Sequence, residues 1–263
     1  MEFFDSHAHY NDEKFDEDRD NIIQATFEEG VTKYICAGYD VASSLKAIEI
    51  AKKYPYIYTI CGISPNDVPE TQEQEEILLQ KIKEMLETAK ANKIVAVGEI
   101  GLDYYWNKEN KQIQKEMFEK QIALANACQL PIVIHTREAV EDTIKMLKEH
   151  PAQKNGIFHC CPMNRELIKE ALKLGYSISF AGPVTFKNAK NADEVIQMVP
   201  MERLLIETDS PYLSPEPLRG RRNDCRNVKY IAQKIADVKN TSLEDVAKIT
   251  YQNAERIFEI FHK

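Results

Sequence analysis

IVAVGEIGLDYY, residues 94–105, is the stretch that decides the fold. Its first four residues are apolar and rich in β-branched side chains, which is typical of a parallel strand covered on both faces. Glu99 follows where such a strand would end, and a carboxylate buried there must be paired, protonated or bound to a metal. Taken alone, Glu99 could equally be an exposed loop residue. Four histidines and an aspartate at the ends of similar stretches favour a functional site.

Strand-like stretches of this kind alternate with helix-like ones along the whole chain. We expect strands at 3–9, 33–37, 57–63, 94–99, 131–135, 156–160, 176–180 and 204–209. We expect helices at 18–29, 42–54, 75–90, 111–129, 138–149, 165–173 and 191–198, then two final helices at 227–238 and 242–261. This α/β alternation predicts a (β/α)8 TIM barrel with two extra C-terminal helices. An open doubly wound sheet competes, but DSHAHY at 5–10 is not the phosphate-binding glycine loop that it needs.

Length and composition agree with one barrel. The chain has 263 residues, close to the roughly 250 typical of this fold, and no linker or repeat divides it, so we expect a single domain over residues 1–263. The net charge of −8 argues against a protein that coats long nucleic acid by electrostatics alone. An anionic substrate would need a local basic patch or a metal.

The six cysteines show no CxxC spacing, and most fall in or beside apolar stretches, which indicates reduced, buried thiols in a cytoplasmic protein. Cys160 and Cys161 lie beside His159, but neighbours on a strand point to opposite faces, so both cannot bind one ion. Neither a signal peptide nor a membrane span is encoded, and we expect no membrane association and no obligate protein partner.

Six side chains form a candidate metal site. His7 and His9 are two residues apart on a strand, so their side chains share one face. His135, His159 and Asp209 each end a strand, and all strand C-termini of a barrel open onto the face where active sites are built. A lone histidine is more often packed neutrally, but with Glu99 the set can hold two divalent ions bridged by this carboxylate. This arrangement predicts metal-assisted hydrolysis.

The motifs DSHAH, GEIGLDYYW, LPIVIHTREA, GIFHC and LLIETDSPYLSPEPLRGRRND together resemble those of the TatD-type metal-dependent deoxyribonucleases, from Phe4 to about Phe258. The resemblance implies a TIM barrel of the amidohydrolase superfamily that hydrolyses phosphodiesters, with 3′ to 5′ exonuclease activity on single-stranded DNA or RNA. It also implies that His7, His9 and Asp209 hold one ion, that His135 and His159 hold the other, and that Glu99 contacts both. A related branch uses a carbamylated lysine at this bridging position.

Three positions depart from the family pattern. Ser64 stands in GISP where the family has GxHP, CCPMN follows His159 in place of FSG, and Cys225 follows RRND in place of proline. None of them is a metal ligand. The first two fall in loops that would surround a substrate, so they bear on which substrate is hydrolysed.

Candidate substrate residues lie in the same loops. Arg219, Arg221 and Arg222 follow the last strand, where barrels often bind phosphate, and Arg137 follows His135 by two residues. The alternative for the RGRR segment is a solvated basic turn. Tyr104, with Asp103, Tyr105 and Trp106, follows Glu99, and such aromatic rings can either stack on unpaired bases or pack beneath the loop.

Several alternatives stay open at this level. Asp209 is the candidate general base, or it is a ligand only. Histidine and carboxylate ligands suit Zn, Mn, Ni and Fe and admit Mg, so the two ions are not identified. The expected activity is removal of nucleotides from the ends of single-stranded DNA or RNA. The alternatives are hydrolysis of a small amide, ester or lactone by the same centre, and a metal-holding binding module without turnover.

Overall fold

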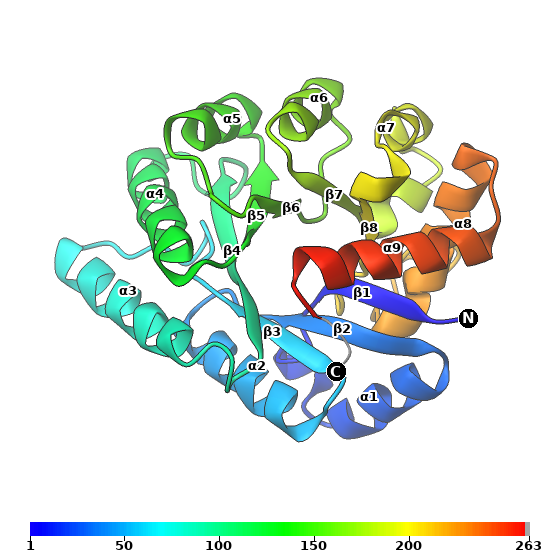
Figure 1. Cartoon of the computed structure of the whole chain (residues 1–263), viewed down its shortest axis with the longest axis horizontal. Helices are drawn as coiled ribbons and strands as arrows, with labels where there is room; N and C mark the ends of the chain where they lie inside the picture. Colours follow the sequence, from blue (N-terminus) through cyan, green and yellow to red (C-terminus); the bar gives the residue numbers. More distant parts are fainter. Residues whose placement is uncertain (261–263) are drawn as a thin grey trace.

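Eight parallel strands lie side by side in the order of the sequence (Figure 1). In the computed structural model, which describes residues 1–260, these strands are Phe3–Ala8 (β1), Val31–Ala37 (β2), Ile57–Cys61 (β3), Ile94–Asp103 (β4), Ile132–Arg137 (β5), Gly156–Phe158 (β6), Ser177–Phe180 (β7) and Leu204–Ile206 (β8). Beyond the ends of β1 and β8, the His9 amide donates to the Ser210 carbonyl at 2.6 Å, and the Asp209 amide donates to the His7 carbonyl at 3.0 Å. These bonds join the first strand to the last and close the barrel at its C-terminal end.

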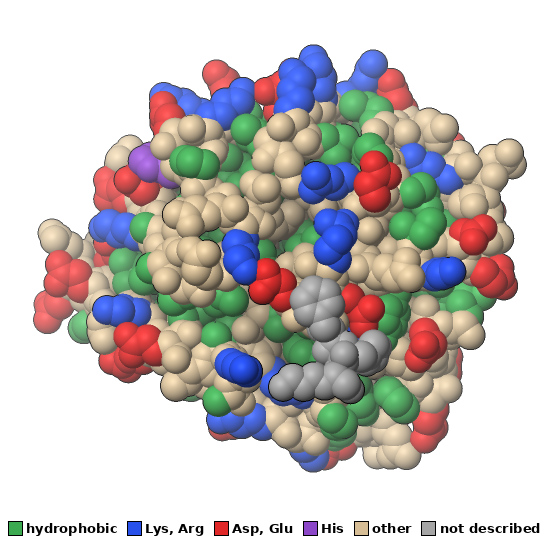
Figure 2. All heavy atoms as spheres, in the orientation of Figure 1, with side chains coloured by type: hydrophobic (Ala, Val, Ile, Leu, Met, Phe, Trp, Pro, Cys, Tyr) green, Lys and Arg blue, Asp and Glu red, His purple; other side chains and the backbone are tan. Residues whose placement is uncertain are grey.

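Helices surround the strands, as Figure 1 shows. Those that follow strands β1 to β7 are Arg19–Glu28 (α1), Val41–Lys53 (α2), Gln72–Glu87 (α3), Lys111–Cys128 (α4), Val140–Glu149 (α5), Arg165–Lys173 (α6) and Ala192–Met198 (α7). Two more, Val228–Lys239 (α8) and Leu243–Ile257 (α9), follow β8, and the four short 3-10 helices within residues 1–260 include Gly182–Thr185 (η2) after β7. On the face drawn in Figure 2, lysine and arginine side chains are interspersed with aspartate and glutamate side chains.

The interior of the barrel explains why the strand ends carry the site. One buried apolar cluster is made of inward-facing strand residues packed against α9: Phe4, Ile35, Ala37, Ile60, Ala96, Val133, Ile157, Leu205, Ala254, Phe258 and Ile260. Because side chains of a strand alternate between faces, Val133 predicts an inward His135 and Ile157 an inward His159. Asp209 lies three residues beyond the end of β8, and the hydrogen bond of its amide to the His7 carbonyl places it at the same C-terminal mouth.

Two strands reach the same mouth through an irregular register. Glu99 is three residues from the inward-facing Ala96, and the β4–β5 register shifts between Val97 and Ile100. His7 is likewise three residues from Phe4, and the β1–β2 register shifts between Asp5 and Ala8. Such bulges re-aim side chains beside active sites, and here they turn His7 and Glu99 inward.

The predicted fold class, the eight strands and the two extra C-terminal helices are confirmed. β4 is longer than predicted and runs to Asp103, whereas β6 and β8 end at Phe158 and Ile206, so His159 and Asp209 lie just beyond their strands. The last helix was predicted to reach Phe261, which lies outside the described residues, and α9 ends at Ile257. Within residues 1–260 no helix is both long enough and apolar enough to cross a membrane.

Candidate metal centre

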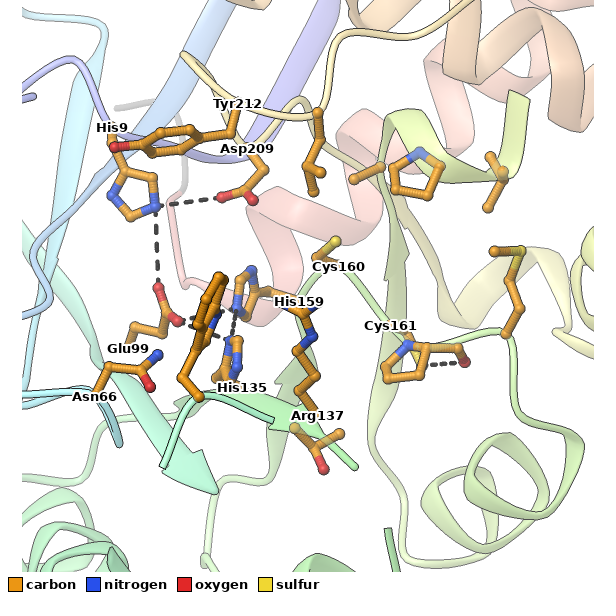
Figure 3. Close-up of a pocket in the computed structure, with 18 residues that line it drawn as sticks. His9, Asn66, Glu99, His135, Arg137, His159, Cys160, Cys161, Asp209 and Tyr212 are labelled. Atoms are coloured by element: carbon orange, nitrogen blue, oxygen red, sulfur yellow. Dashed lines mark hydrogen bonds and ion pairs between the residues drawn. The ribbon is translucent and has the colours of Figure 1, made fainter. Parts of the chain in front are cut away.

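The C-terminal mouth of the barrel holds a cavity of about 870 Å³. Five of the six predicted ligands line it, and the sixth, His7, is fully buried beside them. Figure 3 shows the side chains of His9, Glu99, His135, His159 and Asp209 pointing toward one another from different strand ends. The structure therefore brings together all six residues that the sequence suggested.

His7, His9 and Asp209 form the first cluster. The Nε2 atoms of His7 and His9 are 3.2 Å apart, and Asp209 Oδ1 lies 3.2 Å from the Nε2 of His9 and 3.8 Å from that of His7. These three ligand atoms thus face one common point.

His135, His159 and Glu99 form the second cluster. His135 Nδ1 and His159 Nε2 are 3.2 Å apart, and Glu99 Oε1 lies 2.9 Å from the first and 3.3 Å from the second. The other carboxylate oxygen of Glu99, Oε2, lies 3.4 Å from His7 Nε2 and 3.9 Å from His9 Nε2. Glu99 therefore presents one oxygen to each cluster.

A glycine permits the close approach of β4 and β5 that brings Glu99 to His135. Gly101 has a φ of 142°, and a Cβ at this position would lie 2.0 Å from the His135 carbonyl oxygen. Any other residue would push the two strands apart and would also be strained at this φ.

The donor set fits divalent cations. Ligands bound at about 2.0–2.2 Å in a tetrahedron are roughly 3.4 Å from one another, close to the spacings within both clusters. In each cluster two imidazole nitrogens face each other, and a cation satisfies both lone pairs at once. His7, His9 and Asp209 would hold one ion, His135 and His159 the other, and Glu99 would contact both.

The outer nitrogens of the imidazoles have different partners in the two clusters. His135 Nε2 lies 2.9 Å from Asp103 Oδ2, and His159 Nδ1 lies 3.4 Å from Glu207 Oε1. His9 Nδ1 instead lies 3.0 Å from the carbonyl of Ala37. The buried Nδ1 atoms of His7 and His159 make no hydrogen bond among the described residues, so Glu207 supports His159 through its nearby charge. Carboxylates raise the basicity of ligating imidazoles, so anionic support is confined to the second cluster.

The charges of the clustered groups support one another. Burial alone would raise the pKa of Glu99, but the charge of His159 and hydrogen bonds with His135, His159 and His7 hold it well below its ordinary value. Burial likewise opposes the ionisation of Asp209, but the hydrogen bond with His9 and the nearby charges of His9, His7 and His159 together lower the pKa of Asp209. Both carboxylates are therefore ionised at neutral pH and available as ligands.

Among the histidines, burial lowers the pKa of His7, and the nearby charge of His159 adds to this effect. Burial also disfavours the charged form of the other three, but carboxylates reverse the shift. Asp209 raises the pKa of His9, Asp103 and Glu99 raise that of His135, and Glu99 and Glu207 raise that of His159 well above its ordinary value. In the metal-free protein the raised pKa values of these three histidines therefore favour protonation at the places where a cation would bind.

A family model described as TatD related DNase matches residues 4–259 of this chain. The chain belongs to the TatD family. The predicted resemblance is confirmed, and as a member of this family the protein is a metal-dependent hydrolase.

Individual TatD relatives cover almost the whole chain. A protein of Bacillus subtilis, YabD, described as an uncharacterized metal-dependent hydrolase, is 44% identical over 258 residues, which are 98% of this chain and 99% of YabD. YcfH of Escherichia coli, described in the same words, is 32% identical over 264 residues, 99% of this chain and 97% of YcfH. The crystal structure of YJJV, a TatD homolog from Escherichia coli, has a TM-score of 0.92 at 24% identity and covers 98% of both chains. This last likeness concerns the fold.

Of the predicted substrate residues, Arg137 lines the cavity and Tyr104 does not. Tyr104 packs beneath the loop, the alternative that the sequence left open, and its hydroxyl donates to Asp142 at 2.7 Å. Trp106 lines the cavity instead and is 69% exposed. The Arg137 guanidinium carbon lies 3.7 Å from the ring centre of Tyr105 and 5.5 Å from that of Trp106.

Arg219 and Arg221 are exposed and lie outside the set of residues that lines the cavity. The Arg219 guanidinium carbon lies 4.2 Å from the ring centre of Phe186, and the neighbouring Arg222 is paired with Asp18. Contact of Arg219 and Arg221 with substrate phosphate stays a prediction, for a strand that extends beyond the cavity.

The structure also shows where the departures from the TatD pattern lie. Cys161, Pro162 and Met163 of the CCPMN segment line the cavity, and so does Asn66, which is two residues after Ser64. Ser64 is buried, and its hydroxyl accepts a hydrogen bond from the Asn66 amide at 3.2 Å. Cys225 is fully buried.

Two supporting carboxylates escaped the sequence analysis in this role. Asp103 was considered only with the aromatic residues beside it, and Glu207 was not singled out. The position of Glu207 two residues before Asp209 was a usable signal, since alternation places both on the same face of the chain.

Proposed function

We propose that this protein is a two-metal phosphodiesterase that removes nucleotides from the ends of single-stranded DNA in the 3′ to 5′ direction, and from RNA by the same chemistry. It would use two divalent ions held by His7, His9, Glu99, His135, His159 and Asp209, with Mg, Mn and Zn as the candidate metals. The family description as a DNase and the chemistry of the cavity support this activity.

The observation that carries the proposal is the group formed by Arg137, Tyr105 and Trp106 beside the metal ligands. Arginine can hold a phosphate by two parallel hydrogen bonds. An exposed tryptophan offers a face on which an unpaired base can stack, at about 1–3 kcal/mol per base. One cation and one aromatic surface beside the candidate metal ligands match the phosphate backbone and an unpaired base of a single strand.

Within this site the residues have distinct roles. Bound divalent ions would supply a water of lowered pKa and would neutralise charge on the phosphate. Asp209 is ionised and lines the cavity, so it can accept the proton of the attacking water. Glu99, which faces both clusters, fixes their separation, and Arg137 orients the phosphate.

The preference for single strands follows from size and charge. A cavity of about 870 Å³ lies within the range that holds a small ligand, so it can admit the end of a single strand and is too small for a duplex. A net charge of −8 provides little attraction for a duplex outside the cavity. A single strand can thread its end past Trp106, whereas a paired end must first fray.

The test is release of mononucleotides from single-stranded DNA labelled at its 5′ or 3′ end, with Mg, Mn and Zn tried separately. We expect stepwise shortening from the 3′ end, slower release from blunt duplex and no nicking of closed circles. The same preparations are assayed on a panel of amides, esters and lactones. Turnover of one of these small molecules without nucleotide release would contradict the proposed phosphodiesterase and support the alternative hydrolase. No turnover of any substrate would support a metal-holding binding module.

A further inference from the structure

The cavity above the metal ligands has two chemically different halves. The half over the ligands carries the charged side chains of Glu99, Arg137 and Asp209. The other half, which we name the apolar wall, consists of Cys161, Met163, Pro183, Val184 and Leu213. None of these wall residues is charged, so this half offers a phosphate no charged side chain.

The apolar wall is attached directly to the metal centre along the chain. Cys161 and Met163 follow the ligand His159 by two and four residues, and Leu213 follows the ligand Asp209 by four. Figure 3 shows Cys160 and Cys161 leading away from His159 on the side of the cavity opposite Glu99. A group bound at the wall is therefore joined to the reacting phosphate by a short connection.

Backbone contacts hold the three segments of the wall in place. The Cys161 amide donates to the Ser179 carbonyl of β7 at 3.0 Å. The Thr185 hydroxyl of η2 accepts from the Glu216 amide at 2.9 Å. At Gly182, a Cβ would lie 1.8 Å from the Leu213 carbonyl oxygen, so η2 and the loop after β8 are in close contact. The wall is preformed.

We infer that the apolar wall binds the base of the terminal nucleotide while the phosphate lies over the metal ligands. This inference rests on the proposed function, which supplies the phosphodiester, and extends it to the position of the base. Proline and valine side chains offer apolar surface to a ring, and the thioether of Met163 makes favourable contacts with aromatic systems. Trp106 then lies on the path of the next nucleotide.

The same surface predicts how weakly the enzyme distinguishes one base from another. Reading a base needs donors and acceptors directed at its edge, and the side chains of the wall offer only the weakly polar sulfurs of Cys161 and Met163. Stacking depends on the face that every base has, so it tolerates any sequence. We therefore expect affinities for the four bases within about threefold of one another.

Calorimetric titration of the metal-loaded protein tests the inference with reaction products, so no turnover is needed. The probes are the four deoxynucleoside 5′-monophosphates and deoxyribose 5-phosphate, which carries the phosphate without a base. We expect the nucleotides to bind about 5- to 30-fold more tightly than the sugar phosphate. Equal affinity for both kinds of probe would overturn the inference, as would a preference for one base of more than about tenfold.

The variants Met163→Gln and Leu213→Asn test whether the apolar wall causes the tighter binding of nucleotides. Both positions are partly exposed, glutamine keeps the length of methionine, and asparagine tolerates the φ of 52° at Leu213. Each variant should lose most of the preference for nucleotides and keep the affinity for deoxyribose 5-phosphate. Leu45→Gln, an equal change at a 49% exposed position on α2, is the control and should match wild type. Wild-type preference in both wall variants would overturn the assignment.

An activity measurement separates this inference from the proposed function. Wild type is given two single strands that differ only in whether the last residue carries its base. Faster release of the complete nucleotide, lost in Met163→Gln, supports the wall as the base site, and equal release from both strands overturns it. No release from either strand overturns the proposed function, and the titrations with nucleotides still decide what the wall binds.

Discussion

Replacing Asp103 by asparagine should weaken one ion of the centre and spare the other. Asp103 Oδ2 lies 2.9 Å from His135 Nε2, and its Oδ1 accepts from the amides of Tyr105 at 2.9 Å and Trp106 at 3.2 Å. In Asp103→Asn the side-chain oxygen must continue to accept from the backbone N–H groups of Tyr105 and Trp106, because a side-chain NH2 group at that place would put donors against donors. The NH2 group therefore faces His135.

The consequence is a change of tautomer. His135 would accept at Nε2 and carry its proton on Nδ1, the atom that faces Glu99 and His159. A protonated nitrogen cannot bind a metal, so binding must first shift the proton against the new hydrogen bond. Loss of such an outer partner costs about 10- to 100-fold in metal affinity, or about 1.4–2.7 kcal/mol. The His7, His9 and Asp209 cluster does not contact Asp103, and the partner of His9 is a neutral carbonyl.

Metal content is measured by elemental analysis after gel filtration, and each affinity by competition with a chromogenic chelator. We expect wild type to bind two ions and Asp103→Asn to retain one at wild-type affinity. Asp142→Asn is the matched control, since Asp142 accepts from Tyr104 nearby and contacts no histidine of the centre. Two ions held by Asp103→Asn with wild-type affinity would refute the reasoning, and so would equal weakening of both.

Three further predictions concern the bridge, the protons and the basic loop. Glu99→Gln should lose both ions, because Glu99 presents one carboxylate oxygen to each cluster; two ions at full occupancy by elemental analysis would contradict this. Metal affinity in chelator competition should rise with pH: the pKa values of His9, His135 and His159 are raised in the metal-free protein, so protons compete below these values and are lost above them. An affinity independent of pH between 6 and about 8 would exclude this competition. Arg219→Ala and Arg221→Ala should keep their metal, lower kcat/KM on single-stranded DNA by about 1.5–3 kcal/mol and flatten its salt dependence, whereas an uncharged ester should be affected less. Wild-type rates and salt response would leave the RGRR segment as a solvated turn.

The fold and the meeting of the six candidate ligands could be predicted because both follow from local rules. Alternation along a strand fixes which residues face inward, so the apolar pattern before His135 and His159 already indicated their direction, and the end of the last strand brought Asp209 to the same mouth. Glu99 and His7 were predicted for the right place although bulges, which the apolar pattern does not reveal, turn them inward.

The outer parts of the site could not be predicted because they depend on contacts between distant loops. The orientation of Tyr104 was decided by Asp142 on α5, 38 residues away. The apolar wall consists of residues from three loops that come together only in the folded barrel. Met163, Val184 and Leu213 line one cavity although they lie far apart in the sequence. The sequence pattern alone does not show which loops come together.

The bonds that join the strand ends of β1 and β8 have a consequence for how the protein is made. The amide of Asp209 meets the carbonyl of His7 across roughly two hundred residues of chain. On the ribosome, His7 and His9 therefore lack Asp209 until nearly the whole barrel has been synthesised. An ion that required all three of these residues would bind only after β1 and β8 had met, and it would then stabilise the closed barrel by mass action. A nascent chain stalled before β8 should remain open between these two strands.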